Sequence, residues 1–117
     1  MDLSASLPAI GVDDFFAAEL RVGRIVQAEP FPKARKPAYK LLIDFGPLGR
    51  KQSSAQITAL YAPGDLVGRL VVAVVNFPPR QIADFRSEIL VLGASDADGH
   101  IVLLHPEREV PLGARIQ

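Results

Sequence analysis

Hydrophobic and polar residues alternate along several short stretches of the chain, which is the pattern of half-buried β-strands. Residues 39–45 show it most clearly, because every odd-numbered position there is apolar or aromatic. Residues 20–28 alternate in the same way with one change of phase at Gly23, which predicts a bulge in a long first strand. Residues 50–55 are polar and are predicted to pair back onto 39–45. Residues 70–75 are apolar throughout, as expected of a strand that is covered on both sides.

Two short helices are predicted among these strands. Residues 12–18 are predicted to form one or two helical turns, with Asp13 or Asp14 accepting hydrogen bonds from the free amide groups at the helix start. Residues 56–61 have helical spacing and are followed by Ala-Pro-Gly-Asp, which we interpret as the end of that helix.

The last third of the chain predicts a second hairpin and a final strand. Residues 89–92 and 101–104 flank a turn at 96–99, and 110–116 are predicted to form a last short strand. The fold class is therefore all-β, with five or six short strands and a small helix between the third and fourth. This count and order match the five-stranded Greek-key barrel of the OB fold, with extra strands at the termini. Periodicity alone also fits another small barrel or a sandwich.

The length of 117 residues fits one domain, which we place at residues 12–117 behind a flexible N-terminal arm, residues 1–11. The sequence has no cysteine, which excludes disulfides, thiolate metal sites and a thiol nucleophile. The longest apolar run, residues 70–75, is far shorter than the stretch of about 20 residues that a membrane-spanning helix needs. The N-terminus has no basic start, so a signal peptide is not predicted. We expect a cytoplasmic protein without membrane insertion.

The formal net charge is zero, but the charges are unevenly distributed. Residues 21–51 carry eight basic and two acidic residues, a net charge of +6, and much of this charge falls in a predicted loop at 31–37. A local basic field can bind an anion, because screening confines each charge to about 8–10 Å. The alternative is that these side chains are only the solvated surface of a loop.

The sequence pairs no nucleophile with a base, so we expect no catalytic residues, no cofactor and no metal site. His100 and His105 are interpreted as surface residues. Asp-Ala-Asp-Gly at 96–99 lacks the remaining ligands of an EF-hand loop, so a tight turn is the better interpretation. Gly46 and Gly49 do not have the spacing of a Walker phosphate loop.

Two segments carry residues that suit nucleic acid. The polar run 51–56 offers Ser, Gln and Lys side chains for phosphates or base edges, with a serine that merely caps a helix as the alternative. Residues 76–80 follow the most apolar strand, and two prolines hold Asn76, Phe77 and Arg80 in a fixed presentation. An aromatic ring beside an arginine suits stacking and phosphate contact, and a rigid turn that closes the core is the alternative.

Several motifs in a fixed order resemble one family. RVGRI, KQSSAQIT and VVNFPPR follow one another, and the similarity extends over residues 13–117. The chain resembles the tRNA-binding OB-fold domain family, whose members include domains appended to methionyl- and phenylalanyl-tRNA synthetases. KQSSAQIT and NFPPR point to the CsaA branch of export-related chaperones in that family.

The resemblance implies a non-enzymatic protein and a symmetric homodimer built from the segments that flank the barrel. It implies a chaperone that holds unfolded preproteins bound for secretion, built on a tRNA-binding domain. The alternative is a stand-alone protein that binds tRNA and has no chaperone role. Expected partners are therefore tRNA and unfolded preproteins, with a component of the Sec pathway as a further candidate.

The resemblance also implies which residues do the binding. The nucleic-acid face would comprise Lys40, Lys51, Gln52, Ser53, Ser54, Asn76, Arg80 and Ser87, with Arg35 and Lys36 supplying further positive charge. Phe77, Ile82 and Phe85 are the candidates for a peptide-binding groove, and burial in the barrel or in a dimer interface is their alternative. The family often has glycine where this chain has Asp84, which raises the question of a positive φ at that position.

Overall fold

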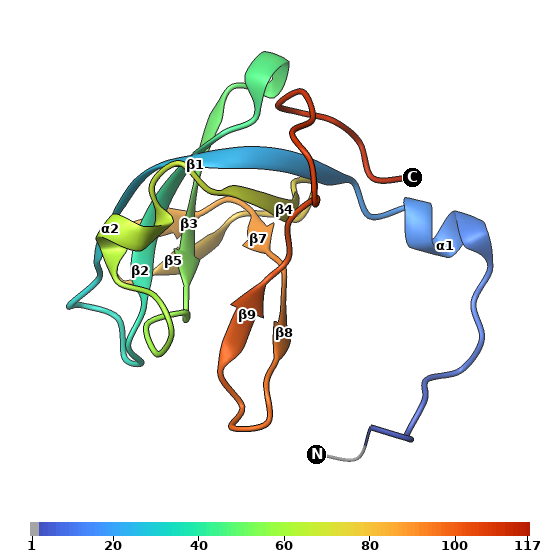
Figure 1. Cartoon of the computed structure of the whole chain (residues 1–117), viewed down its shortest axis with the longest axis horizontal. Helices are drawn as coiled ribbons and strands as arrows, with labels where there is room; N and C mark the ends of the chain where they lie inside the picture. The colour runs from blue at the N-terminus through green and yellow to red at the C-terminus, as the bar shows by residue number, and fades with distance from the viewer. Residues whose placement is uncertain (1–2) are drawn as a thin grey trace.

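The strands of the main sheet curl into a nearly closed barrel in this computed structural model, which describes residues 3–117 (Figure 1). Neighbouring strands are antiparallel, in the order β3-β2-β1-β4-β7. The strands are β1 (Leu20–Pro30), β2 (Tyr39–Asp44), β3 (Arg50–Ala55), β4 (Leu70–Val74) and β7 (Leu90–Val91). The all-β class and the OB-type barrel predicted from the alternating pattern are thus confirmed.

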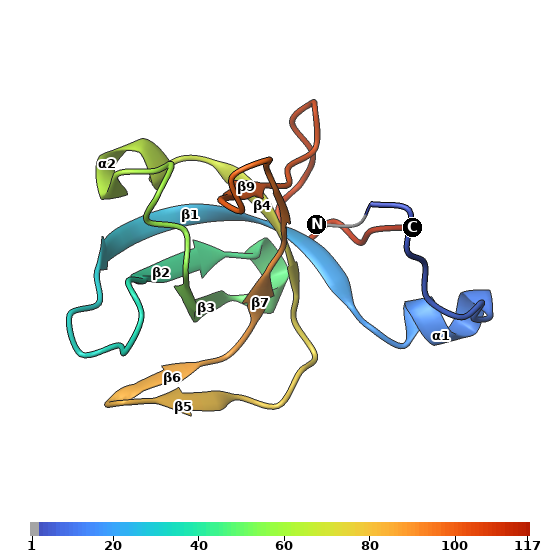
Figure 2. The same cartoon turned by 90° about the horizontal axis from the view of Figure 1, so that it is seen from below.

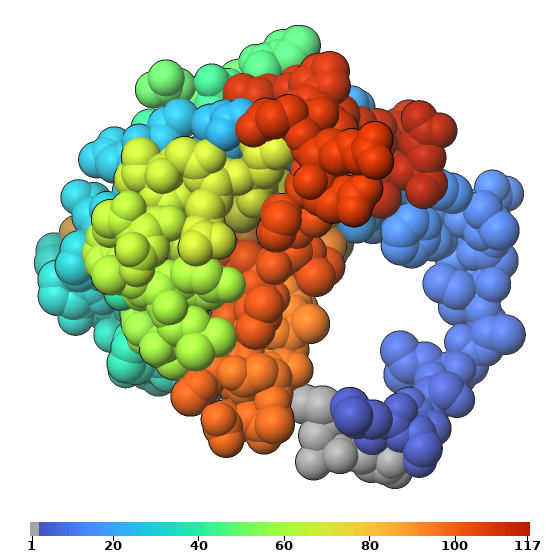
Figure 3. Space-filling view, viewed as in Figure 1, coloured from blue at the N-terminus to red at the C-terminus, as the bar shows by residue number. Residues whose placement is uncertain are grey.

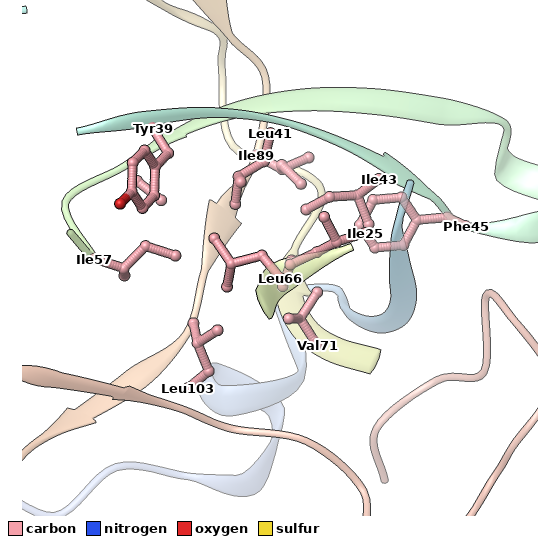
Figure 4. Packing of buried hydrophobic residues seen from close by; sticks show 12 residues of the cluster. Ile25, Tyr39, Leu41, Ile43, Phe45, Ile57, Leu66, Val71, Ile89 and Leu103 are labelled. Carbon is pink, nitrogen blue, oxygen red and sulfur yellow. The ribbon is translucent and has the colours of Figure 1, made fainter. Parts of the chain in front are cut away.

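Apolar side chains from the inner faces of these strands fill the barrel (Figure 4). In β2 the odd-numbered residues, including Leu41 and Ile43, are buried, and the even-numbered ones stay partly exposed. Leu66 enters the same cluster from α2 (Pro63–Leu66) and is fully buried. The helix between β3 and β4 therefore closes one end of the barrel core.

This helix lies later in the chain than the sequence predicted. Residues 56–61 are irregular chain with a turn at 58–60, and α2 begins only at Pro63. Proline suits the first turn of a helix because no intrahelical donor is needed there. The Asp65 carboxylate accepts a hydrogen bond from the Ala62 amide at 3.2 Å, which caps the helix. The Pro-Gly pair that we interpreted as the end of a helix is its beginning.

The bulge in β1 also lies away from its predicted position. The register between β1 and β2 shifts between Ile25 and Gln27, whereas Gly23 pairs regularly with β4. Gly23 serves close packing instead, because a Cβ atom there would lie 2.6 Å from Cγ2 of Ile43 and 2.7 Å from Cε1 of Phe45. The change of phase in the sequence therefore marks the position in β1 where the barrel core leaves no room for a side chain.

A hairpin that the sequence did not predict leaves the barrel between β4 and β7. It consists of β5 (Arg80–Ile82) and β6 (Phe85–Ser87), which form a two-stranded sheet of their own (Figure 2). Its turn contains Ala83, the only non-glycine residue within 3–117 that has a positive φ, at 52°. The positive φ considered at Asp84 therefore falls one residue earlier.

The C-terminal hairpin consists of β8 (Gly93–Ser95) and β9 (Ile101–Leu103), so its first strand was predicted too early in the chain. Residues 90–91 belong to the barrel instead. The tight turn at 96–99 is confirmed, because Asp96 Oδ1 accepts hydrogen bonds from the amides of Asp98 and His100, both at 2.9 Å. His100 is exposed beside it, and His105 is exposed in the segment that follows.

The final segment does not form the strand predicted at 110–116. A single bridge joins Arg21 of β1 to Arg115. Gly113 donates its amide proton to the Val22 carbonyl at 2.7 Å, and Val22 in turn donates to the Ala114 carbonyl at 2.9 Å. The segment is thus tied to β1 as irregular chain. A 3-10 turn, η1 (Gly46–Leu48), connects β2 to β3.

The segment ahead of the barrel stands away from it (Figure 3). Residues 3–11 are exposed along their whole length and lead into α1 (Val12–Phe16). The N-cap residue is Gly11 and not one of the predicted aspartates; Asp14 lies in the first turn, where its Oδ2 atom accepts a hydrogen bond from the Gly11 amide at 3.0 Å. The first two residues of the predicted arm lie outside the described residues, and the flexibility of the arm stays a prediction. Within residues 3–117 no helix has the length and apolar character needed to cross a lipid bilayer.

Candidate nucleic-acid interface

A hollow of about 610 Å³ opens between the 31–38 loop, the end of β3 and the β5–β6 hairpin. We call it the basic pocket, because four cationic side chains line it: Lys33, Arg35, Lys36 and Arg80. The side chains between these cations are small, apolar or amide-bearing, among them Ala38, Ile82, Gln56 and Gln81. The pocket therefore combines positive charge with both apolar and hydrogen-bonding surface.

The 31–38 loop is anchored by a small hydrophobic cluster that is separate from the barrel core. Phe31, Ala38 and Phe85 are buried in it, and Ala34 and Ile82 pack against them. The rings of Phe31 and Phe85 meet edge to face with their centroids 5.4 Å apart. The Phe31 amide donates to the Ala38 carbonyl at 3.0 Å, which closes the loop at its base. The basic loop is therefore packed onto the hairpin and does not extend into solvent alone.

Lys40 of β2 covers this cluster. Its Nζ atom lies 4.9 Å from the ring centroid of Phe31 and 5.4 Å from that of Phe85, which makes cation–π contacts with both rings. Lys40 is half-buried and lines a second, smaller hollow of about 110 Å³ together with Gln27 and Glu29. It therefore lies near the basic pocket without lining it.

An ion pair joins the two walls of the basic pocket. Lys33 Nζ in the loop lies 2.7 Å from Asp84 Oδ2 in the hairpin turn. The hydrogen bond from Lys33 holds the pKa of the Asp84 carboxyl below its usual range, and the same bond raises the pKa of Lys33. Both groups are exposed, so the pair contributes little to the stability of the whole domain.

The other three cations of the basic pocket have no such partner. Within residues 3–117, the side chains of Arg35, Lys36 and Arg80 make no hydrogen bond or ion pair, and all three are exposed. Unpaired like charges around one hollow add their potentials and favour an anionic ligand. The arrangement can therefore hold phosphate groups without first breaking protein contacts.

The Lys-Gln-Ser-Ser segment lies in the seam where the barrel closes between β3 and β6. The side-chain Nε2 of Gln52 donates to the Arg86 carbonyl at 2.8 Å. The backbone carbonyl of Gln52 accepts a hydrogen bond from the Glu88 amide at 2.9 Å. The Ser54 amide donates to Ser87 Oγ at 3.0 Å. These bonds take the place of a regular ladder between the two strands.

Two of the serines predicted for the nucleic-acid face are buried in this seam. Ser53 is 1% exposed, and its hydroxyl donates to the Ile89 carbonyl at 3.3 Å; Ser87 is 8% exposed. Buried hydroxyls that are already bonded cannot reach an RNA on the surface, so we assign them to barrel closure. Ser54 is half-buried and lines the basic pocket, and it is the one serine of the set that stays available.

Asn76 and Lys51 lie outside the basic pocket. Asn76 Oδ1 accepts a hydrogen bond from the Glu19 amide at 2.8 Å, and its Nδ2 donates to the Ala17 carbonyl at 2.9 Å. Both polar groups of Asn76 are thus used to hold the end of α1 against the chain that follows β4. Lys51 is half-buried and pairs across the sheet with Ile43 of β2.

The three candidate peptide-binding residues do not form one open groove. Phe77 is 48% exposed in the segment before β5, whereas Phe85 is 8% exposed and Ile82 is half-buried against it. Burial, the alternative considered for these residues, applies to Phe85. Only Phe77 presents its ring to solvent.

Gln56 and Gln81 line the basic pocket and were not among the predicted site residues. Gln56 belongs to the polar run 51–56 but was interpreted as the start of a helix. Gln81 lies in a hairpin for which the sequence gives little signal, because β5 and β6 have only three residues each. An alternation of apolar and polar residues over three positions occurs often by chance, so it does not identify a strand.

The comparisons with known proteins converge on one family. The profile of the family described as "Putative tRNA binding domain" matches residues 20–115. A methionine–tRNA ligase of Methanococcus aeolicus is 38% identical over 107 residues. That similarity covers 92% of this chain but only 15% of the ligase, so the chain corresponds to a small part of that relative.

Two solved structures are similar over their entire length. The chaperone CsaA from Bacillus anthracis is 52% identical, with a TM-score of 0.89, and the match covers 94% of this chain and 100% of that one. The CsaA chaperone protein from Picrophilus torridus is 49% identical with a TM-score of 0.87, and the match covers 93% of this chain and 100% of that one. The resemblance inferred from the three motifs is confirmed.

The ion pair across the basic pocket predicts a shifted titration of Asp84. In the Lys33→Met variant the pKa of the Asp84 carboxyl rises toward its usual range, because the hydrogen bond that favours the charged form is gone. The pair holds the two walls together at pH above the usual carboxyl range and is lost as pH falls through the lowered pKa. Carboxyl carbon shifts in an NMR titration measure this change.

Lys36→Met is the matched control for that titration, because Lys36 lines the same pocket but has no carboxylate partner within residues 3–117. It should leave the Asp84 pKa where it is in the wild type. Equal Asp84 pKa values in the wild type and in Lys33→Met would contradict the ion pair.

Proposed function

Since this chain belongs to the tRNA-binding domain family, we propose that it binds tRNA and that the basic pocket is the centre of the contact. The observation that carries this proposal is the set of three unpaired cations, Arg35, Lys36 and Arg80, around one hollow on the barrel. Phosphates of the RNA backbone are the ligands that such a set favours. The proposal assigns the protein no catalytic reaction.

The charge of the surrounding surface supports this placement. Residues 21–51 carry a net charge of +6, and the basic pocket draws three of its four cations from this stretch. Contacts of this kind position an RNA by its backbone and contribute most of the affinity through release of counterions. We therefore propose that the protein recognises the shape and phosphates of tRNA and reads few bases directly.

We also propose a second activity, in which the protein holds unfolded preproteins in the cytoplasm before their secretion. The favourable observation is the similarity over the full length to two proteins named as CsaA chaperones. Phe77 has an exposed aromatic side chain in the segment before β5, and this ring offers apolar contact to an extended peptide. A component of the Sec pathway would be the downstream partner in this proposal.

We further propose that two chains form a homodimer through the segments that flank the barrel. α1 and the residues ahead of it expose six large apolar side chains: Leu3, Leu7, Ile10, Val12, Phe15 and Phe16. Exposed apolar surface of this extent is typical of an interaction site. A second copy would cover it and would place two basic pockets on one particle.

Salt dependence tests the tRNA contact. Fluorescence anisotropy of labelled tRNA should show binding that weakens steeply between about 50 and about 200 mM salt, with each phosphate contact adding about 0.7–0.9 to the slope of log K against log salt. Arg80→Ala should weaken binding and reduce that slope, because one contact is lost. Arg108→Ala removes the same charge from an exposed position in the C-terminal segment and should have little effect. A complex insensitive to salt, or equal losses in both variants, would contradict the proposal.

Aggregation of an unfolded client tests the chaperone activity. When urea-unfolded luciferase is diluted into buffer, an equimolar amount of the protein should suppress light scattering, because exposed apolar segments of the client are held. Phe77→Ser should weaken this protection. Leu48→Ser changes another exposed apolar side chain, in the β2–β3 connection, and should protect as the wild type does. Undiminished scattering at an excess of wild-type protein would rule the activity out.

Sedimentation equilibrium tests the dimer. The wild type should have twice the chain mass of 12.6 kDa. Changing Phe15 and Phe16 together to Ser should shift the population to the monomer, because both rings leave the proposed interface. Leu60→Ser, at an exposed apolar position between β3 and α2, should stay dimeric. A wild-type mass of one chain at micromolar concentration would disprove this assembly.

A further inference from the structure

The shape of the basic pocket restricts what part of an RNA can enter it. Its volume of about 610 Å³ lies within the range of about 300–1,000 Å³ that small-molecule sites occupy. The outer surface of an RNA duplex is convex, and its phosphates follow one another along a ridge that touches the rim of such a hollow. A single nucleotide that leaves the stack has the size and shape to go in.

The lining of the basic pocket offers a separate kind of group for each part of a nucleotide: the phosphate, the base and the ribose. Arg35, Lys36 and Arg80 offer unpaired positive charge for a phosphate. Ile82 offers an apolar surface for the face of a base, and the amide of Gln56 offers a donor and an acceptor for a base edge or a ribose hydroxyl. Phosphate contacts alone would need only the cations.

The pocket is also braced before any ligand arrives. The Phe31–Phe85 ring contact at 5.4 Å joins the two walls at the base, and the Lys33–Asp84 ion pair at 2.7 Å joins them at the turn. The buried ring contact at the base limits the movement of the two walls, so the hollow loses less conformational entropy when one ligand fills it. A preformed pocket of this kind favours one nucleotide bound in a single position over non-specific contacts along the backbone of a duplex.

We infer that the basic pocket holds one unpaired nucleotide of the RNA, with its phosphate among Arg35, Lys36 and Arg80 and its base against Ile82. The inference rests on the proposed tRNA binding and specifies the part of the tRNA that is bound. A single-stranded end or loop enters the pocket, and the paired stems contribute only phosphate contacts around it.

Competition against labelled tRNA tests this inference with the wild-type protein. The competitors are an unstructured oligouridylate of about six nucleotides, a length that one OB fold can cover, and a blunt RNA duplex with the same number of phosphates. The single strand should displace tRNA at a concentration about tenfold lower than the duplex, which corresponds to about 1.4 kcal/mol of binding free energy. If the protein binds tRNA but the duplex competes as well as the single strand, the inference is overturned and the proposed function still stands. Failure to bind tRNA at all would instead overturn the proposed function.

A variant that fills the pocket without changing its charge provides the second test. Gln56→Trp places a large ring in the basic pocket, and Gln56 is exposed without a side-chain hydrogen bond within residues 3–117, so the fold should tolerate it. The ring occupies the space that the base would take, so the oligouridylate should then compete about tenfold less well, a loss of about 1.4 kcal/mol of binding free energy. Gln27→Trp makes the same change in the neighbouring hollow of about 110 Å³ and should have no effect on competition. Equal effects of the two variants, or none from Gln56→Trp, would refute the assignment.

Discussion

The closure of the barrel between β3 and β6 is the constraint on which the binding surface depends. Most of the hydrogen bonds there pair a backbone group with a side chain, with Gln52 and Ser54 on one side and Ser87 and Glu88 on the other. If β3 and β6 were joined by a regular ladder of backbone hydrogen bonds, the residues between β4 and β7 would have to stay in the sheet. Because the seam needs only a few bonds around β6, the preceding residues are free to leave the sheet as the β5–β6 hairpin and to form one wall of the basic pocket.

Charge and packing occupy different layers of this surface. The cations of the 31–38 loop reach solvent, and directly beneath them Phe31 and Phe85 hold the loop to the hairpin. Lys40 joins the layers, since its ammonium group lies over both rings. Because its ammonium group contacts the two rings, Lys40 stabilises the packing of the loop on the hairpin and is less available to a ligand than the exposed cations are. The same residue type therefore serves two roles within one small region.

The sequence predicts the barrel well because its strands are long enough for alternation to be read, as in β2, where buried and exposed residues follow the pattern without exception. It fails where the signal is short or ambiguous. Pro63 suits both the end and the beginning of a helix, and three-residue strands such as β5 carry no periodicity. The candidate site is predicted in part: Arg35, Lys36 and Arg80 meet at one pocket, but Ser53 and Ser87 are drawn into the seam by contacts between residues 33 or more positions apart, which no local pattern reveals.

The two hydrophobic clusters share no residue, since the barrel core and the Phe31–Phe85 cluster are built from separate side chains. Substitutions in the loop or hairpin can therefore change what the protein binds while the barrel keeps its own packing. A domain with this division can be attached to other proteins and retuned for new ligands without having to be stabilised again each time.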